Sequence, residues 1–209
     1  MPSVSPLHGV LEHEEIRRLS RALSGRPPSR VDPADPIRRA AVALLLRLGG
    51  SGEIELLLIK RAVYASDPWS GHVALPGGRQ EAGDPTLLHT AIRETREEVG
   101  VDISGHGAVL GVLDELGPST PRLPPLTILP HVAAVERDLP LTLSREVADA
   151  FWVPLSRLRD PAASREVDLD LATGVKRVRS LSYKEHIIWG LTERILRQFF
   201  AILDAPEPR

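Results

Sequence analysis

The alternation of hydrophobic and polar positions in the first third of the chain predicts one helix followed by two strands. Apolar residues recur at helical spacing, with charged residues between them, over 11–24, which predicts an amphipathic helix that ends near Gly25. Branched and apolar residues then dominate 40–48 and 54–62, and a glycine-rich GGSGE stretch separates them. This arrangement favours two strands joined by a glycine turn.

The rest of the chain alternates strand-like and helix-like segments. The expected elements are strands at 108–116 and 126–136, a short strand and then a helix opening at Pro154 within 146–158, a hairpin within 164–183, and an amphipathic helix at 187–203. Prolines within 117–125 predict a loop. The sum is an α/β fold of the α+β sandwich kind, a mixed β-sheet flanked by helices.

The chain has 209 residues, of which 42% are hydrophobic, enough for one good-sized domain with a real core. We expect residues 1–37 to form an N-terminal helix and a proline-rich linker, and residues 38–209 to form the main domain. The N-terminal segment carries no catalytic feature. It can cover the domain or help it form a homodimer, and the sequence does not decide between these roles.

Composition excludes several classes of function. Lys and Arg total 26 against 28 Asp and Glu, a formal net charge of −2 that gives no reason to expect a nucleic-acid partner. Cysteine is absent, so disulfides and cysteine-ligated metals are ruled out. The N-terminus does not resemble a signal peptide, and no run of eighteen apolar residues predicts a membrane span. We therefore expect a cytoplasmic protein with no membrane partner.

A predicted helix with a crowded acidic face carries the main chemical signal. Asp84 is expected to cap its N-terminus, with Pro85 at the first helical position, and Gly100 to end it. At about 100° per residue, its apolar stripe, which packs on the sheet, contains Leu88, Ala91, Ile92, Thr95 and Val99. Glu94, Glu97 and Glu98 form a second stripe beside it.

The acidic stripe is unfavourable unless something neutralises it. Its three carboxylates repel one another and lie near the negative end of the helix dipole. A divalent cation would relieve this, and oxygen ligands without clustered Cys or His favour Mg²⁺ or Mn²⁺ over Zn²⁺. The alternative is a solvated helix face with ion pairs along it. Gly77 and Gly78, which precede the helix and permit close approach to a ligand, favour the metal site.

This block resembles the Nudix box, in which a glycine and an acidic residue precede an R-E-x-x-E-E-x-G pattern. Five residues separate Gly78 from Asp84, and eight more lead to the run Arg93 to Val101, RETREEVGV. Thr95 stands where the box has an apolar residue. The aspartate and the longer spacer resemble the coenzyme A pyrophosphatase branch of the family. So do LLLIKR at 56–61, GHVALPGG at 71–78 and IIWGLTERIL at 187–196.

The resemblance implies a Nudix fold and a metal-dependent hydrolase. By position, Glu94, Glu97 and Glu98 would bind Mg²⁺ or Mn²⁺, together with the carbonyl oxygen of Gly78. Arg93 would orient a metal-binding carboxylate through a bidentate contact. Asp84 would anchor that arginine or cap the helix.

Hydrolysis also needs a base that removes a proton from the attacking water. Glu98 is the first candidate, because burial and neighbouring carboxylates would raise its pKa. Glu146 is the second, and a plain surface role is equally expected for it. Lys60 and Arg61, together with the Gly77–Gly78 loop, are candidate contacts of the substrate phosphates, although a solvated strand end explains the two basic residues as well.

Three functions remain open on these grounds. The leading one is hydrolysis of coenzyme A or an acyl derivative to phosphopantetheine, or its acyl form, and adenosine 3′,5′-bisphosphate. The second is the same chemistry on a nucleotide sugar, a dinucleotide or a nucleoside triphosphate. The third is a non-catalytic ligand sensor, against which the intact Glu94, Glu97 and Glu98 argue. For the base of the nucleotide, Trp69 is a candidate stacking residue, although simple packing is favoured.

Overall fold

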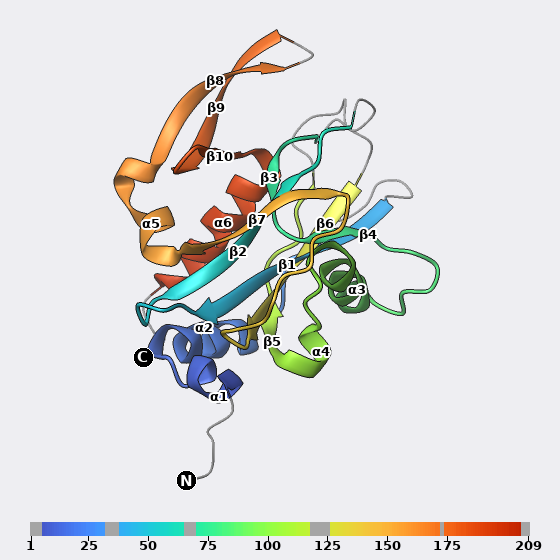
Figure 1. Ribbon diagram of the computed structural model, residues 1–209, viewed down its shortest axis with the longest axis vertical. Helices are drawn as coiled ribbons and strands as arrows, with labels where there is room; N and C mark the ends of the chain where they lie inside the picture. The colour runs from blue at the N-terminus through green and yellow to red at the C-terminus, as the bar shows by residue number, and fades with distance from the viewer. Residues whose placement is uncertain (1–5, 32–37, 65–69, 118–125, 172–173, 206–209) are drawn as a thin grey trace.

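The computed structural model describes residues 6–31, 38–64, 70–117, 126–171 and 174–205, and its main feature is a mixed sheet between two layers of helices (Figure 1). Within these residues, seven strands form the sheet, in the order β3-β2-β1-β6-β5, with β4 also pairing with β1 and β7 with β2. Strands β1 and β6 are parallel and the other pairs are antiparallel. The expected mixed sheet with flanking helices is confirmed.

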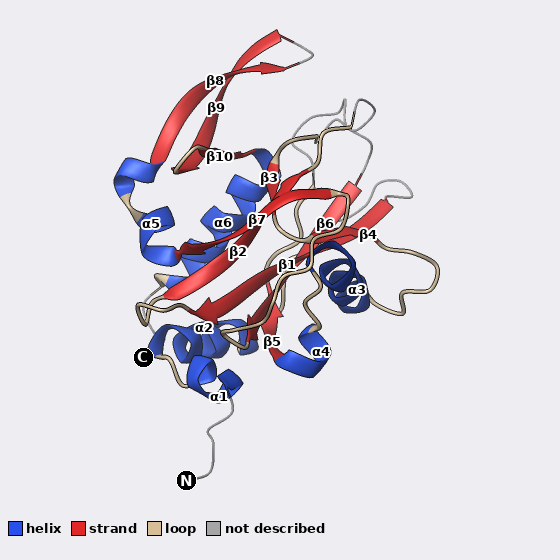
Figure 2. Ribbon diagram, in the orientation of Figure 1, coloured by secondary structure: helices blue, strands red, loops and turns tan. Residues whose placement is uncertain are grey.

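Figure 2 shows the strands of both sheets in red and the helices in blue. The main sheet consists of β1 (Arg38–Leu48), β2 (Ile54–Arg61), β3 (Val73–Ala74), β4 (Gly77–Arg79), β5 (Gly107–Val112), β6 (Leu126–Val135) and β7 (Val147–Pro154). A smaller sheet consists of β8 (Ser164–Leu171), β9 (Gly174–Tyr183) and β10 (His186–Trp189). The helices are α1 (Pro6–Leu11), α2 (Glu14–Ser24), α3 (Leu87–Val99), α4 (Ile103–His106), α5 (Leu155–Arg159), the 3₁₀ turn η1 (Pro161–Ala163) and α6 (Gly190–Leu203).

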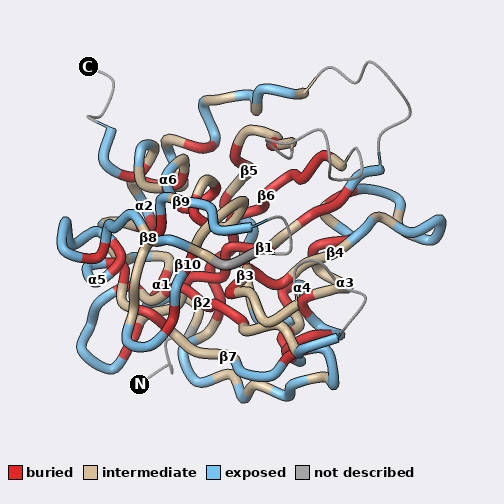
Figure 3. The backbone as a smooth tube through the Cα atoms, turned by 90° about the horizontal axis from the view of Figure 1, so that it is seen from above, coloured by how far each residue is buried: buried red, intermediate tan, exposed pale blue. Residues whose placement is uncertain are grey.

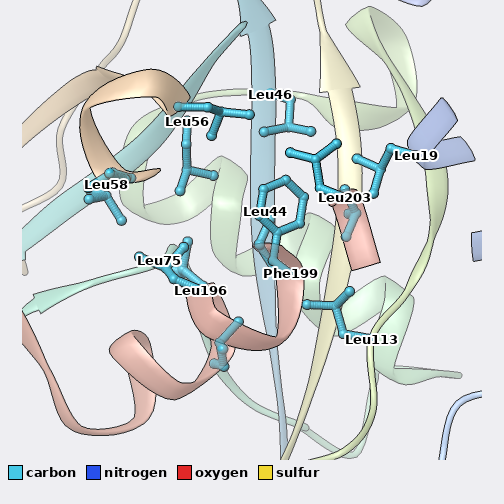
Figure 4. Packing of buried hydrophobic residues seen from close by; sticks show 14 of the residues in the cluster. Leu19, Leu44, Leu46, Leu56, Leu58, Leu75, Leu113, Leu196, Phe199 and Leu203 are labelled. Atoms are coloured by element: carbon cyan, nitrogen blue, oxygen red, sulfur yellow. The ribbon is translucent and has the colours of Figure 1, made fainter. Parts of the chain in front are cut away.

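The main sheet is buried on both faces, because side chains alternate along its central strands. On β1, Leu44 and Leu46 point into a core shared with α2 and α6, whereas Ala43 and Leu45 point into a second core under α3. Figure 4 shows the first core, where Phe199 of α6 lies among leucines from the sheet. The buried residues form the centre of the molecule in Figure 3.

The N-terminal helix α2 is part of the first core. Ile16, Leu19 and Leu23 are almost fully buried against the sheet and α6. A Cβ placed on Gly111 of β5 would lie 2.6 Å from the Cβ of Leu23, so this strand needs glycine for the helix to approach. The sequence predicted the helix but not this contact, nor the short helix α1 that precedes it.

Several boundaries differ from the sequence predictions. Residues 187–189, expected in the last helix, belong to β10, and α6 begins at Gly190. Their backbone groups pair with β9. The apolar spacing of the helix that follows also fits these residues, which is why the sequence pattern placed them in the helix. Strand β7 runs through Pro154, so α5 begins one residue later than expected, at Leu155. Most of the expected loop 117–125 lies outside the described residues. Within them, the structure contains no helix long and apolar enough to cross a membrane.

Candidate active site

Helix α3 ends as predicted but begins differently. Gly100 closes it in the left-handed conformation, with φ 76°, and donates its N–H to the carbonyl of Arg96. The N-cap is Thr86, whose hydroxyl accepts from the backbone N–H of His89, and not Asp84 as the sequence predicted. Asp84 and Pro85 precede the helix, since the carboxylate of Asp84 is held by other groups.

Asp84 anchors Arg93. The guanidinium donates from Nε to Oδ1 at 3.0 Å and from Nη2 to Oδ2 at 2.9 Å, a bidentate pair. Oδ2 also accepts from the hydroxyl of Thr90 at 3.0 Å and from the N–H of Glu81 at 3.0 Å. These bonds, chiefly those from Arg93, hold the pKa of Asp84 well below its usual range, and the pKa of Arg93 is raised in turn. Asp84 therefore stays ionised and fixes the arginine.

The remaining donor of Arg93 connects this pair to the acidic stripe. Its Nη1 lies 3.0 Å from Glu94 Oε1 and 3.0 Å from Glu97 Oε2. The side chain of Glu94 is 17% exposed, whereas that of Glu97 is 59% exposed. Burial raises the pKa of Glu94, and Arg93 opposes this shift. One arginine thus holds two of the three stripe carboxylates.

The third carboxylate, Glu98, is buried, and its pKa lies near neutral pH. Its Oε2 accepts from the backbone N–H of Gly77 at 2.8 Å, and its Oε1 lies 3.9 Å from Nη1 of Arg61. Burial raises the pKa of Glu98 to about 7, against the opposing effect of the Gly77 bond and Arg61. The charges of Glu94 and Glu146 add to the rise. Glu98 is therefore able to exchange a proton at physiological pH.

The glycine pair lies in β4, directly under α3. Gly77 and Gly78 pair with Val42 and Ala41 of β1. Gly77 has φ 152°, and a Cβ there would overlap the backbone of β1. A Cβ on Gly78 would overlap the carboxylate of Glu94. Glycine at position 77 lets this strand lie against β1, and glycine at position 78 leaves room for the carboxylate of Glu94.

A loop from distant sequence completes the carboxylate cluster. Backbone N–H groups of Thr142 and Ser144 donate to the last carbonyls of α3, those of Val99 and Glu98, at 2.9 and 3.0 Å. The carbonyl of Glu146 accepts from Ala62 at 2.8 Å. The loop thereby brings the exposed Glu146 close enough to act on the pKa of Glu98.

The two basic candidates at the end of β2 separate. Arg61 lies beside Glu98. Leu56 and Leu58, which share the strand face of Lys60, belong to the core on the α6 side of the sheet. The structure therefore brings Arg61 together with the stripe and the glycine pair, and turns Lys60 toward the other face. Trp69 lies outside the described residues.

The donor set fits a hard divalent cation, with one rearrangement. Glu94, Glu98 and the backbone of Gly78 offer only oxygen, as Mg²⁺ and Mn²⁺ prefer. Glu94 and Glu98 are neighbouring carboxylates with raised pKa values, and a bound cation would stabilise their ionised forms. Across the described ranges, no three acidic or histidine side chains are already gathered around one point. Glu97, whose Oε2 accepts from Arg93, would join them by turning its carboxylate toward Glu94 and Glu98.

Sequence reasoning missed Thr90, which is fully buried and bonds Asp84. A polar residue on the buried side of a predicted helix was the available signal, because such a group needs a partner. The pairing of Thr90 with Asp84 also explains why the aspartate does not cap the helix.

Comparison with known proteins identifies the family of this chain. A sequence profile of the NUDIX domain matches residues 37–171, more than half of the chain. The chain belongs to the Nudix family, and its sheet between two layers of helices is the Nudix fold. A curated relative is the uncharacterized protein C14C4.10c of Schizosaccharomyces pombe, 33% identical over 167 residues. The match covers 71% of this chain and 51% of the yeast protein, so the chain spans about half the length of that relative.

Two solved structures match this chain at low identity, and the first of them has the same fold. A MutT/nudix family protein from Enterococcus faecalis is 18% identical, with a TM-score of 0.57 over 82% of this chain and 63% of its own. The Ap4A hydrolase of C. elegans, solved as a binary complex, is 23% identical, with a TM-score of 0.48 over 57% of this chain and 82% of its own. At this level of identity the similarity is one of fold only, and the chemistry of this chain depends on its own residues.

Proposed function

We propose that this protein is a metal-dependent hydrolase of compounds in which a nucleoside diphosphate is linked to another group. The observation that carries the proposal is the buried Glu98, which lies beside Glu94 and Arg61 and accepts a hydrogen bond from the glycine strand. Family membership supports this reaction class. A sensor would have no need of a buried carboxylate with a pKa of about 7.

Each residue then has a role in the reaction. Glu94, Glu97, Glu98 and the Gly78 carbonyl would hold Mg²⁺ or Mn²⁺, which neutralises phosphate charge and activates water. Arg93, fixed by Asp84, positions Glu94 and Glu97 for binding. The N–H of Gly77 orients Glu98.

The chain must also bind the pyrophosphate and remove a proton from water. Arg61 is placed to bind a phosphate oxygen next to Glu98. Glu98 is the proposed base, because it is buried beside Glu94, Arg61 and the glycine strand, and burial raises the pKa of its carboxyl in the metal-free protein. Glu146 is the second candidate, since it reaches the same cluster from its loop.

The finer proposal for the substrate is coenzyme A or acyl-coenzyme A, with adenosine 3′,5′-bisphosphate as one product. The longer spacer before Arg93 and the aspartate at position 84 support it. The structure adds that this aspartate anchors Arg93 and does not cap the helix. A nucleotide sugar, a dinucleotide or a nucleoside triphosphate is the alternative substrate.

A substrate panel tests both levels of the proposal. Coenzyme A, ADP-ribose, NADH, diadenosine polyphosphates and dGTP are incubated with Mg²⁺ or Mn²⁺, with Glu98→Gln as the comparison. Release of adenosine 3′,5′-bisphosphate from coenzyme A, lost in the variant, supports the finer proposal. Turnover of another member of the panel alone removes coenzyme A and keeps the reaction class. Metal binding without any turnover favours a sensor.

A further inference from the structure

A second concave site lies on the other side of the molecule from the acidic helix. The projecting hairpin β8–β9 packs against α6 (Figure 1). A cavity of about 440 Å³, partly open to solvent, lies between them. Arg165, Arg179, Arg197, Glu193, Leu181 and Phe200 are among the residues that line it. Helix α6 packs on the sheet face opposite α3, so the cavity is separate from the Glu98 cluster.

The charges in this cavity do not cancel. Its two carboxylates are already paired, Glu166 with Arg177 of the neighbouring strand at 2.9 Å and the buried Glu193 with Arg197 one turn along α6. Within the described ranges, no carboxylate lies at ion-pair distance from Arg165 or Arg179. By register, Arg179 shares the face of Leu181, whereas Arg165 lies on the opposite face of the hairpin. Arg179 is therefore the arginine that presents an unpaired positive charge to the cavity, since Glu166, across the hairpin from it, is bonded to Arg177.

The floor of the cavity is apolar. Leu181 of β9 and Phe200 of α6 are half-buried and lie at the edge of the first core. A guanidinium binds phosphate or carboxylate oxygens in pairs, and a concave apolar surface holds the body of a small ligand. Together these features fit an anionic head group attached to a small apolar body.

We propose that the cavity between α6 and the β8–β9 hairpin binds a small molecule that carries a phosphate or carboxylate group on an apolar body. Arg179 binds the anionic group, and Leu181 and Phe200 contact the body. The site does not depend on the proposed hydrolase reaction, because it shares no residue with the Glu98 cluster.

Titration calorimetry of the full chain in EDTA tests the proposal with three probes. Phenylphosphonate and benzoate represent the two head groups on an apolar body, and inorganic phosphate lacks the body. We expect saturable binding of one molecule per chain for phenylphosphonate or benzoate, and the tighter probe identifies the head group. Inorganic phosphate should bind at least about fivefold more weakly than phenylphosphonate. Equal affinity would overturn the assignment of the apolar floor.

Matched variants locate the binding. Arg179→Gln should weaken it by at least about fivefold, whereas Arg165→Gln, on the opposite face of the hairpin by register, should weaken it less. Lys176→Gln is the control, because it removes the same charge from an exposed position on the opposite face of β9. Both hairpin arginines are exposed, so thermal melting should show unchanged folding.

Three results would overturn the proposal. The first is no saturable binding of either apolar probe up to about 10 mM. The second is an equal loss in Lys176→Gln and Arg179→Gln, which would show attraction by net charge only. The third is loss of binding in Glu98→Gln, which would place the probe at the acidic helix.

Discussion

At the scale of single residues, the candidate site depends on three glutamates of one helix that differ in burial and in their hydrogen-bond partners. Glu97 is largely exposed and Glu94 half-buried, and both bind Arg93, whereas Glu98 is buried with a backbone partner. Burial raises the pKa of Glu94 and Glu98, because removing a carboxylate from water disfavours its charged form. The same sequence motif thus supplies an ion-paired acid and a titrating one.

Glu98 should make the metal-free protein less stable as pH rises. Its folded pKa of about 7 exceeds the ordinary value of about 4.3, so the folded state binds more protons between these limits. The free energy of unfolding should therefore fall across that window, by about 4 kcal/mol at most. Glu98→Gln, which still accepts from Gly77, should remove this part of the slope. Urea unfolding in EDTA at pH 5 and pH 8 measures it.

The control for this experiment is Glu81→Gln, since the side chain of Glu81 is 69% exposed. It should keep the slope of the unmodified protein. Parallel pH profiles of Glu98→Gln and the unmodified protein would contradict the assignment of Glu98 as the titrating group.

Asp84 should act on stability in the opposite direction. Its lowered pKa stabilises the fold above the ordinary value of about 3.9, and this contribution disappears as the pH falls further. Asp84→Asn should cost about 2 kcal/mol at pH 7, because Arg93 loses its bidentate partner. The cost should shrink at pH 3. Asp138→Asn, at a side chain that is 90% exposed, is the control, and equal effects of both variants would refute the anchor.

At the scale of elements, the site is the meeting of one helix, one short strand and one loop. Strand β4 passes under α3 because Gly77 and Gly78 have no side chains to obstruct it. The loop that carries Glu146 is fixed by hydrogen bonds to the last carbonyls of α3. These backbone contacts place the carboxylates, and the side chains supply the chemistry.

Gly78→Ala should keep the fold and lose metal affinity. Its new methyl group would displace the end of the Glu94 side chain and leave the backbone of β1 in place. We expect Mn²⁺ binding, measured by calorimetry, to weaken at least about tenfold. Gly83→Ala is the matched control, since nothing lies within 4 Å of its added Cβ. Unchanged Mn²⁺ affinity in Gly78→Ala would count against Glu94 as a ligand.

Helix α2 should contribute to stability as a part of the main core. Leu19→Ala should lower the free energy of unfolding by about 2–4 kcal/mol, because Leu19 is almost fully buried against α6 and the sheet. Arg17→Ala, at a side chain 62% exposed on the same helix, should change it by less than about 0.5 kcal/mol. If the two variants were equally stable in urea, α2 would be a loosely attached segment.

At the scale of the whole molecule, the main sheet divides the protein into two sides with different roles. One face carries α3 and the carboxylate cluster. The other carries α2 and α6 with the larger core, part of which is shown in Figure 4. The projecting hairpin extends from that second side, where it forms the arginine-lined cavity with α6. A cation bound to the carboxylates should therefore stabilise the chain without changing the hairpin.

Mg²⁺ or Mn²⁺ should raise the melting temperature. Binding at 100 times the dissociation constant stabilises the folded state by about 2.7 kcal/mol, which corresponds to about 5–10 °C for a chain of this size. EDTA should reverse the shift, and Glu94→Gln should reduce it. A shift of equal size in Glu94→Gln would show that the ion binds elsewhere.

Much of this could be predicted from the sequence because the relevant signals are local. Strands β1, β2 and β6 follow from their apolar runs, and Gly100 ends α3 as its position indicated. The roles of Glu94, Glu97, Glu98 and Gly78 in metal binding stay predictions. The prediction that Asp84 caps α3 was wrong, since Asp84 has a stronger partner in Arg93 than the helix end provides.

The sequence by itself determined the family, the mixed sheet and the acidic face of α3, because short-range spacing records periodicity, turns and motif. Only the tertiary structure decided that Glu98 is buried while Glu97 is exposed, and that Arg61 faces the site while Lys60 does not. It also decided that Glu146 reaches Glu98 and that α2 completes the core. These outcomes depend on which segments pack together, and burial and long-range pairing set them rather than the spacing of neighbouring residues.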